Sequence, residues 1–186
     1  FYPHRKNENI MRSFGISSDK FNLIHFGAIG PANGLEYLIN AARILNSEKI
    51  NDIQIILLGG GMIRKELEKE VEDCRLNTIV YFIDSQPMNI TSEIVNCCDC
   101  SIICFKNLQV LQTNSPNKLF DSLAAGKPVI VNSAGWTKDL VEENQCGFFV
   151  DPEKPDDLVK AVLKFKNDKD LAILMGKNAR SLAENK

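Results

Sequence analysis

Lys118 and Asp121 lie three residues apart in a stretch whose pattern predicts a short helix. Ser115 is a suitable N-cap, Pro116 suits the first helical position, and Gly126 ends the helix. The start of a helix gathers unpaired N–H groups, so it attracts anions, and Lys118 adds a full positive charge there. Asp121, one turn further on, offers a carboxylate that accepts hydrogen bonds from the hydroxyls of a ribose or sugar. The stretch therefore predicts a site for a phosphate beside a diol.

Two glycine-rich loops each follow an apolar segment and open a helical one. Gly27 and Gly30 lie in the first loop, and Gly60 and Gly61 lie in the second. Small residues let the phosphates of a ligand approach the backbone. The glycine spacing is not that of a dinucleotide-binding fingerprint, and a plain strand-to-helix turn explains the first loop equally well.

Two cations occupy the first turn of the helix that follows the second loop. Arg64 and Lys65 stand there, although positive charge is disfavoured near a helix N-terminus. This local conflict indicates an anion site, and a solvated helix face is the alternative interpretation. Asp84 ends the next predicted strand, where we favour a loop cap over a ligand contact.

Within the predicted helix after Ser115, the apolar residues Leu119, Phe120 and Leu123 are expected to form the buried face.

His25 lies in an otherwise apolar strand, where we favour a packed strand residue over a ligand.

The elements that must position these residues alternate between strand and helix about six times with short connections. This alternation predicts an α/β fold: a doubly wound, Rossmann-like parallel sheet of about six strands. Residues 1–20 read as a linker segment and residues 21–186 as one domain. In such sheets the loops at the carboxyl ends of the strands share one rim, so the candidate residues are expected to meet there. The expected strands are 22–26, 53–58, 79–83, 100–104, 127–132 and 147–150, and the expected helices include 7–14, 34–45, 88–97, 135–143, 155–167 and 169–184.

Composition excludes several classes of function. The 186 residues are 44% hydrophobic and 25% charged, which is ordinary for a globular domain. The 22 basic and 24 acidic residues give a net charge of −2, hence no general basic field for nucleic acid or anionic lipid. No apolar run approaches the length of a membrane span, and no signal peptide is recognised.

Six cysteines are present, and three of them cluster at Cys97, Cys98 and Cys100. This cluster enters an apolar strand, and only two histidines, His4 and His25, occur in the chain. We therefore favour reduced, packed thiols over a metal site and expect a cytoplasmic protein.

The run SPNKLFDSLAAGKPV, which begins at Ser115, resembles the donor-site segment of family-4 (group 1) glycosyltransferases. CGFFVDP at 146–152 and the three glycines at 59–61 fit the same pattern. The resemblance points in particular to the branch that builds bacterial surface polysaccharides, including the N-acetyl-fucosamine transferases. It covers nearly the whole chain, but only as the C-terminal half of a two-domain GT-B enzyme. Since the chain starts at Phe1, we expect a fragment that lacks the N-terminal acceptor domain.

This resemblance implies a retaining transfer of a hexosyl or N-acetylhexosaminyl group from a nucleotide sugar, with UDP as the expected nucleotide. The acceptor would be a glycan or a lipid-linked sugar, and no metal or other cofactor is expected. The enzyme would be cytoplasmic, with a possible peripheral contact to the inner membrane face through the missing half. No catalytic residue is identified, and this half alone is expected to bind a nucleoside diphosphate without transferring sugar.

The sequence departs from the family pattern at two places. Of the two glutamates that the resembling enzymes separate by seven residues, the second aligns with Asp121 and the first with Thr113. The loop after the first strand lacks the usual Arg and Lys, so Lys65 or Arg64 is the natural substitute. The expected donor-site residues are therefore Gly27, Gly30, Gly60, Gly61, Arg64, Lys65, Asp84, Thr113, Ser115, Asn117, Lys118 and Asp121.

Two alternative functions remain open at this stage. A GT-B nucleotide-sugar epimerase shares the donor domain but needs a carboxylate or histidine base at the cleft. A non-catalytic doubly wound module of receiver type needs an acidic cluster after the first strand, and Ile24-His25-Phe26-Gly27 lacks one. A nicotinamide dehydrogenase is disfavoured because its glycine fingerprint is absent.

Overall fold

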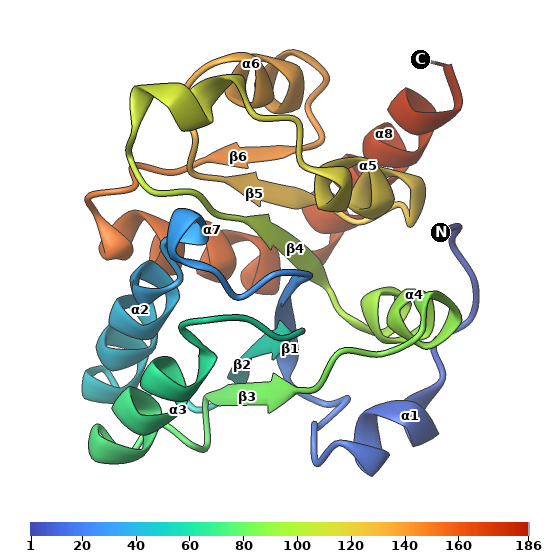
Figure 1. The fold of residues 1–186 in the computed structure, drawn as a ribbon. Coiled ribbons are helices and arrows are strands. Elements are labelled where there is room, and N and C mark those ends of the chain that lie inside the picture. Colours follow the sequence, from blue (N-terminus) through green and yellow to red (C-terminus); the bar gives the residue numbers. More distant parts are fainter. Residues whose placement is uncertain (186) are drawn as a thin grey trace.

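A parallel sheet of six strands, in the order β3-β2-β1-β4-β5-β6, forms the centre of the computed structural model, which describes residues 1–185 (Figure 1). The predicted doubly wound fold is confirmed. The strands are β1 Phe21–Phe26, β2 Ile53–Leu58, β3 Val80–Ile83, β4 Cys100–Ile103, β5 Val129–Val131 and β6 Gly147–Phe149. Successive strands are joined by helices, as parallel pairing requires.

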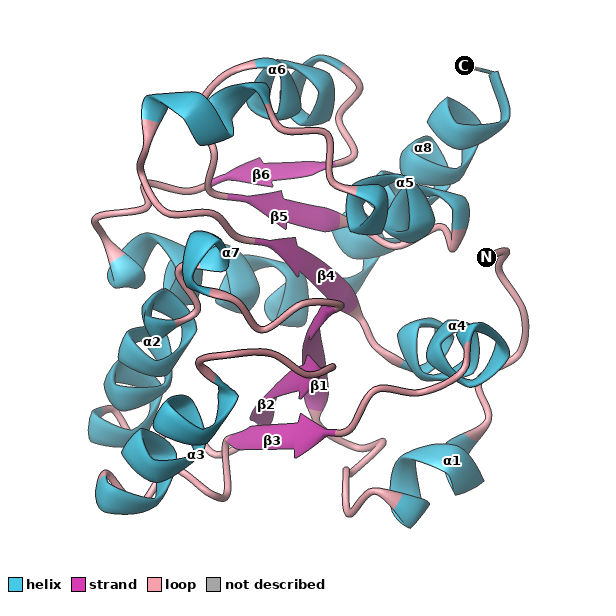
Figure 2. Cartoon of the chain, viewed as in Figure 1, coloured by secondary structure: helices cyan, strands magenta, loops and turns pink. Residues whose placement is uncertain are grey.

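Helices cover both faces of the sheet (Figure 2). Helices α2, α3 and α7 lie together on one face, and α1, α4 and α5 lie on the other. Their bounds are α1 Glu8–Ser13, α2 Glu36–Ser47, α3 Arg64–Asp73, α4 Met88–Cys97, α5 Asn117–Ala124, α6 Trp136–Glu143, α7 Pro155–Asn167 and α8 Lys169–Asn185, with short 3-10 helices at Pro31–Asn33 and Gln109–Thr113. The bounds expected for β2, α4 and α7 are confirmed, and the other expected elements differ by one or two residues at their ends.

The core follows from the alternation of side chains along the strands. Leu23 of β1 lies opposite Ile55 of β2 and Cys100 of β4, and all three pack under α2 and α7. The next residues, Ile24 and Ile56, point to the other face, toward α4. Every residue of β2 is buried, which explains its uninterrupted apolar sequence apart from Gln54.

The N-terminal segment predicted as a linker packs against the domain. Helix α1 contacts α4, and Met11 on α1 is fully buried. Lys6 forms an ion pair with Asp99 at 2.7 Å, just before β4. The segment therefore contributes to the apolar core of this half of the sheet.

Helix α5 begins later than predicted. It starts at Asn117, and Pro116 is its N-cap residue in an extended conformation (φ −80°, ψ 119°). Within residues 1–185 the Ser115 hydroxyl makes no capping hydrogen bond, and the first bond of the helix runs from the Leu119 N–H to the Pro116 carbonyl at 3.0 Å. The predicted N-cap role of Ser115 and helical position of Pro116 are therefore wrong.

The buried face of α5 also differs from the prediction. Leu119, Ser122 and Leu123 form it, while Phe120 is 46% exposed. Phe120 lies about 100° around the helix from Leu119 and stacks on Trp136 of α6, with 6.1 Å between ring centroids. The Ser122 hydroxyl enters the core because it donates a hydrogen bond to the Lys118 carbonyl at 2.6 Å.

The cysteines pack as predicted, except for the partly exposed Cys74. Burial raises the pKa of the Cys98 and Cys100 thiols, so both stay protonated at neutral pH. Within residues 1–185, no group of three His, Cys, Asp or Glu side chains is placed to hold a metal ion. None of the helices described is both long and apolar enough to span a membrane.

Gly59 provides a test of this packing. Its φ is +144°, and a Cβ added there would lie 1.9 Å from the Gly27 carbonyl oxygen, whereas a Cβ on Gly30 would meet nothing within 4 Å. We expect Gly59→Ala to lower the free energy of unfolding by about 1–3 kcal/mol. The matched variant Gly30→Ala should change it by less than about 0.5 kcal/mol. Urea unfolding measures both, and equal stability of the two variants would contradict the close approach of the loops.

Candidate functional site

The site lies where the chain reverses its direction across the sheet. From β1 the chain moves outward to β2 and β3, then returns to β4 on the other side of β1. Such a reversal leaves a crevice beyond the carboxyl ends of the two central strands, and ligands of doubly wound sheets bind there. A cavity of about 590 Å³ opens at this place. Its walls are the loops after β1, β2, β3 and β4 and the start of α5.

Half of the predicted donor-site residues line this cavity. They are Gly27, Gly60, Ser115, Asn117, Lys118 and Asp121. The cavity is not lined by Gly30, Gly61, Arg64, Lys65, Asp84 or Thr113. The predicted residues of the central loops and of α5 therefore meet at one rim of the sheet, and the other six predicted residues lie outside the cavity.

Among the described residues that line the cavity, Lys118 is the one with a cationic side chain. Its ammonium nitrogen lies 3.3 Å from Nε2 of His25, and its Cε would be 3.6 Å from a Cβ placed on Gly27. The side chain thus reaches from α5 across the end of β1. Burial lowers the pKa of Lys118 to about 8, which still leaves the amine mostly charged at neutral pH.

Asp121 stands one helical turn beyond Asn117 on the same wall of the cavity. Partial burial raises the pKa of its carboxyl group above the ordinary value. No hydrogen bond to this carboxylate is formed by another residue in the described part of the chain. Its oxygens are therefore free to accept hydrogen bonds from a ligand.

The two glycine loops are tied together by the backbone. Gly27 donates its N–H to the Leu58 carbonyl, and Ile29 donates to the Gly60 carbonyl, each at 2.9 Å. Gly61 packs on this connection, because a Cβ there would lie 2.3 Å from the Ile29 carbonyl oxygen. Gly61 therefore has a structural reason to be glycine, whereas Gly27 and Gly60 also face the cavity.

Arg64 lies outside the cavity and is engaged within the protein. Its guanidinium donates to the Gly59 carbonyl at 2.7 Å and forms ion pairs with Glu68 and Asp84, each at 2.7 Å. These contacts join the end of β2 to the start of α3 and to the loop after β3. Lys65 is exposed on the surface of α3.

Several cavity residues were not among the sequence predictions. Phe26 is the last residue of β1, Phe105 lies just after β4, and Ser85 and Gln86 belong to the loop after β3. His25 contacts the cavity only through Lys118. The one signal for His25 was a polar residue in an apolar strand, which the packed-residue interpretation also explains.

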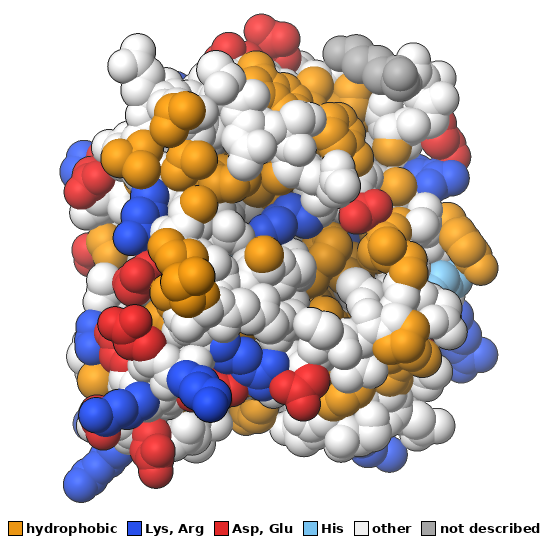
Figure 3. All heavy atoms as spheres, viewed as in Figure 1, with side chains coloured by type: hydrophobic (Ala, Val, Ile, Leu, Met, Phe, Trp, Pro, Cys, Tyr) orange, Lys and Arg blue, Asp and Glu red, His pale blue; other side chains and the backbone are white. Residues whose placement is uncertain are grey.

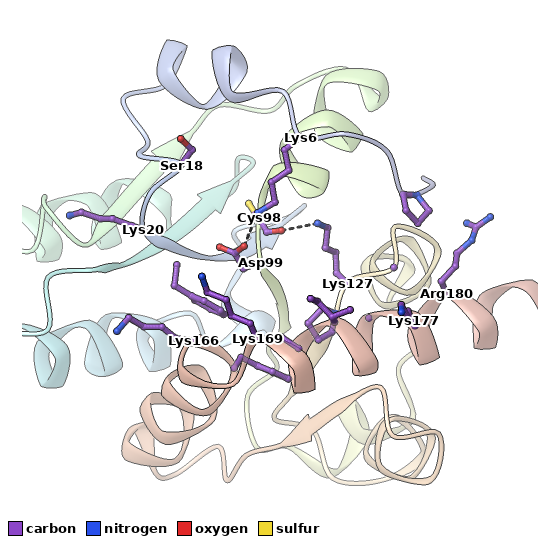
Figure 4. A pocket seen from close by; sticks show the side chains of 18 of the residues that line it. Lys6, Ser18, Lys20, Cys98, Asp99, Lys127, Lys166, Lys169, Lys177 and Arg180 are labelled. Atoms are coloured by element: carbon purple, nitrogen blue, oxygen red, sulfur yellow. Dashed lines mark hydrogen bonds and ion pairs between the residues drawn. The ribbon is translucent and has the colours of Figure 1, made fainter.

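A second and larger cavity, of about 940 Å³, lies at the amino ends of the strands (Figure 4). Figure 4 shows Lys6 directed at Asp99 and Lys127 directed at the Cys98 carbonyl. Lys127 also donates to the Asn96 carbonyl at 2.6 Å, so this partly buried cation holds the end of α4. Because ligands of this fold class bind at the carboxyl ends, the smaller cavity is the candidate site.

The sequence model of the family described as glycosyl transferases group 1 matches residues 6–182 of the chain. The chain belongs to this family. It is 24% identical over 86% of its length to an uncharacterized glycosyltransferase of Methanocaldococcus jannaschii, and it covers 39% of that protein. A D-inositol 3-phosphate glycosyltransferase of Corynebacterium urealyticum is 26% identical over 94% of the chain, which covers 42% of it. The chain thus spans about two fifths of the length of these curated relatives.

Solved structures of glycosyltransferases share the fold. HepE of Anabaena in complex with UDP superposes with a TM-score of 0.81 at 20% identity, over 95% of this chain and 47% of that one. The C-terminal domain of LpcC, a group 1 family protein from Francisella tularensis, superposes with a TM-score of 0.81 at 19% identity, over 100% of this chain and 95% of that one. The sheet and its helices therefore have the architecture of one Rossmann-like half of a GT-B enzyme.

Arg64 and its exposed neighbour give a matched test of the loop anchor. We expect Arg64→Gln to lower the free energy of unfolding by about 1–3 kcal/mol, since the Gly59 carbonyl loses a charged donor. Lys65→Gln removes the same charge from the same turn and should change stability by less than about 0.5 kcal/mol. Urea unfolding compares the two. If Arg64→Gln is as stable as the parent but loses affinity for a nucleoside diphosphate, Arg64 is a phosphate ligand instead.

Proposed function

We propose that this domain holds the nucleotide-sugar donor of a retaining glycosyltransferase, with a nucleoside diphosphate in the cavity beside β1 and β4. The carrying observation is that Lys118 and Asp121, whose carboxylate has no hydrogen-bond partner within residues 1–185, share a cavity wall at the point where the chain reverses. Membership of the group 1 family and the UDP complex of a protein with this fold support the proposal.

In this assignment the diphosphate lies at the start of α5. Lys118 supplies the charge, and the helix N-terminus at Asn117 supplies backbone donors. Asp121 accepts hydrogen bonds from the ribose hydroxyls, and the loop of Ser85 and Gln86 borders the place left for the base. These groups stabilise the negative charge that develops on a departing nucleoside diphosphate, a task that needs no metal ion.

The rest of the reaction requires an acceptor site. We propose that the chain is the C-terminal donor-binding half of a longer enzyme, because it spans about two fifths of its curated relatives. The face in Figure 3 gathers hydrophobic side chains around α5 and α6, and the exposed Leu108, Val110 and Phe120 suit a surface that faces another domain.

We further propose that the complete enzyme moves a hexosyl or N-acetylhexosaminyl group from a UDP-sugar to a glycan or lipid-linked acceptor in surface polysaccharide synthesis. The sequence run from Ser115 to Val129 supports this branch, including its N-acetyl-fucosamine transferases. A cytoplasmic enzyme that contacts the membrane through its other half would fit such an acceptor. His25 offers no support for the epimerase alternative, since it is fully buried and cannot meet a substrate.

Two substitutions on α5 test the assignment of the diphosphate and the ribose. Asp121→Asn should weaken UDP binding by about ten- to a hundredfold, because a hydrogen bond to a charged group is worth about 1.5–3 kcal/mol. Lys118→Ala should weaken UDP more than uridine and flatten the salt dependence of UDP binding. Lys160→Ala, on the exposed side of α7, removes the same charge as a control.

Isothermal titration measures these affinities, after a thermal-shift screen of UDP, GDP, ADP and dTDP has identified the nucleotide that stabilises the domain. All variants should remain folded, since neither side chain belongs to the face of Leu119 and Leu123. If both folded variants bind the diphosphate as the parent does, α5 is not the donor site.

The domain alone is expected to bind the nucleotide sugar without transferring its sugar. Transfer requires an acceptor hydroxyl held close to the anomeric carbon, and only the donor rim is assigned to these residues. Product analysis after incubation of the purified domain with a UDP-sugar and candidate acceptors measures this. If the purified domain transfers sugar in the presence of an acceptor and the Lys118→Ala variant does not, the proposal that transfer needs a second domain is wrong.

A further inference from the structure

The ammonium group of Lys118 is held by the strand beside it. His25 is the fifth residue of β1, pairs in register with Leu57 of β2, and is 0% exposed. Its Nε2 lies 3.3 Å from Nζ of Lys118, across 93 residues of sequence. No other hydrogen-bond partner of this Nζ is found in residues 1–185. A buried strand residue of this kind is far less mobile than the four-carbon side chain that it contacts.

The hydrogen bond runs from lysine to histidine. Burial, together with the positive charge of Lys118, lowers the pKa of His25 to about 3, although the Ala28 and Ile102 carbonyls oppose the shift. The ring is therefore neutral across the physiological range. A charged ammonium has no lone pair, so Nε2 must accept the hydrogen bond from Lys118, and the ring proton then lies on Nδ1. The same Nε2 lies 3.4 Å from the Ala28 carbonyl oxygen, which accepts the side-chain amide of Asn33 at 2.8 Å.

We propose that His25 is a positioning residue for the donor diphosphate: it fixes the Lys118 ammonium over the end of β1 and aims its remaining N–H groups into the cavity. An ammonium has three donors, and His25 takes one. The inference rests on the proposed donor function of this cavity. It explains how a loop without cations, from Gly27 to Gly34, still presents a fixed positive charge beside its backbone.

Holding the side chain in advance removes part of the entropy that binding must otherwise overcome. Immobilising a rotamer-rich side chain at an interface costs about 0.5–1.5 kcal/mol. Removing the His25 acceptor should therefore weaken UDP by about two- to tenfold. Uridine binding should not change, because uridine carries no phosphate for Lys118 to meet.

The pH dependence of binding reports the same group. Burial lowers the pKa of Lys118 to about 8, and a bound phosphate must raise it, so UDP affinity should hold up to about pH 8 and fall above it. The other titratable groups near Lys118 are Asp121 on its own helix, His25 on β1 and Cys104 after β4. The latter two stay neutral, because burial lowers the pKa of His25 and raises that of Cys104 to about 12. Phe1 also lines the cavity, so its α-amino group is acetylated for this measurement.

The test is a double-mutant cycle on the purified domain, with UDP and uridine as probes. His25→Leu removes the acceptor, and His25→Gln retains a side-chain oxygen that can replace it. Ile24→Leu, the neighbouring buried residue that faces α4, is the control for a general disturbance of β1. We expect His25→Leu to weaken UDP alone, to move the alkaline limb of binding to lower pH, and to be partly rescued by glutamine. In a Lys118→Ala background, His25→Leu should have no further effect.

The outcomes separate the inference from the function on which it rests. If the parent domain binds none of the nucleoside diphosphates, the donor function is wrong and the inference falls with it. If the parent binds UDP but His25→Leu has no effect, or an equal effect without Lys118, only the positioning role is overturned. Should His25→Leu fail to fold, the glutamine variant and the parent pH profile decide: a flat UDP affinity from pH 7 to about 9.5 contradicts the proposal.

Discussion

The burial of β1 from Asn22 to Phe26 is the constraint on which the rest of the structure depends. This strand is hydrogen-bonded to β2 on one side and to β4 on the other, and both of its faces are covered. A strand in this position has no contact with solvent except at its ends. The chemistry of the domain is therefore concentrated where β1 ends, at Phe26 and Gly27, and where the direction of the chain reverses.

The basic side chains of this domain differ in how many of their N–H donors are already hydrogen-bonded to protein groups. Arg64 and Lys127 both point inward, to the carbonyl of Gly59 and to those of Asn96 and Cys98, so each stabilises a loop or helix end. Lys118 is also largely buried, but its partner is a neutral ring that accepts a single hydrogen bond. It keeps donors and charge for a ligand, which the other two do not.

Burial gives the pair His25 and Lys118 its properties. The same desolvation lowers the pKa of both groups, but the ordinary value for lysine is so much higher that only histidine becomes neutral at physiological pH. One donor and one acceptor result, without any carboxylate to neutralise the charge. An acidic partner at the position of His25 would hold the ammonium more firmly but would compete with a phosphate for it.

The sequence by itself determined the fold class, the approximate number of strands and the family, because hydrophobic periodicity and local motifs act over a few residues. It also placed Lys118 and Asp121 on one helix at one rim, since their spacing and the carboxyl-end rule need no tertiary contact. Only the tertiary structure decided that Arg64 is paired with Asp84 inside the protein. It also decided that Phe120 stacks on Trp136 and that His25 contacts Lys118. These outcomes depend on which side chains from distant segments arrive at the same place, and on how much water remains there. Neither is encoded in the spacing of residues along the chain.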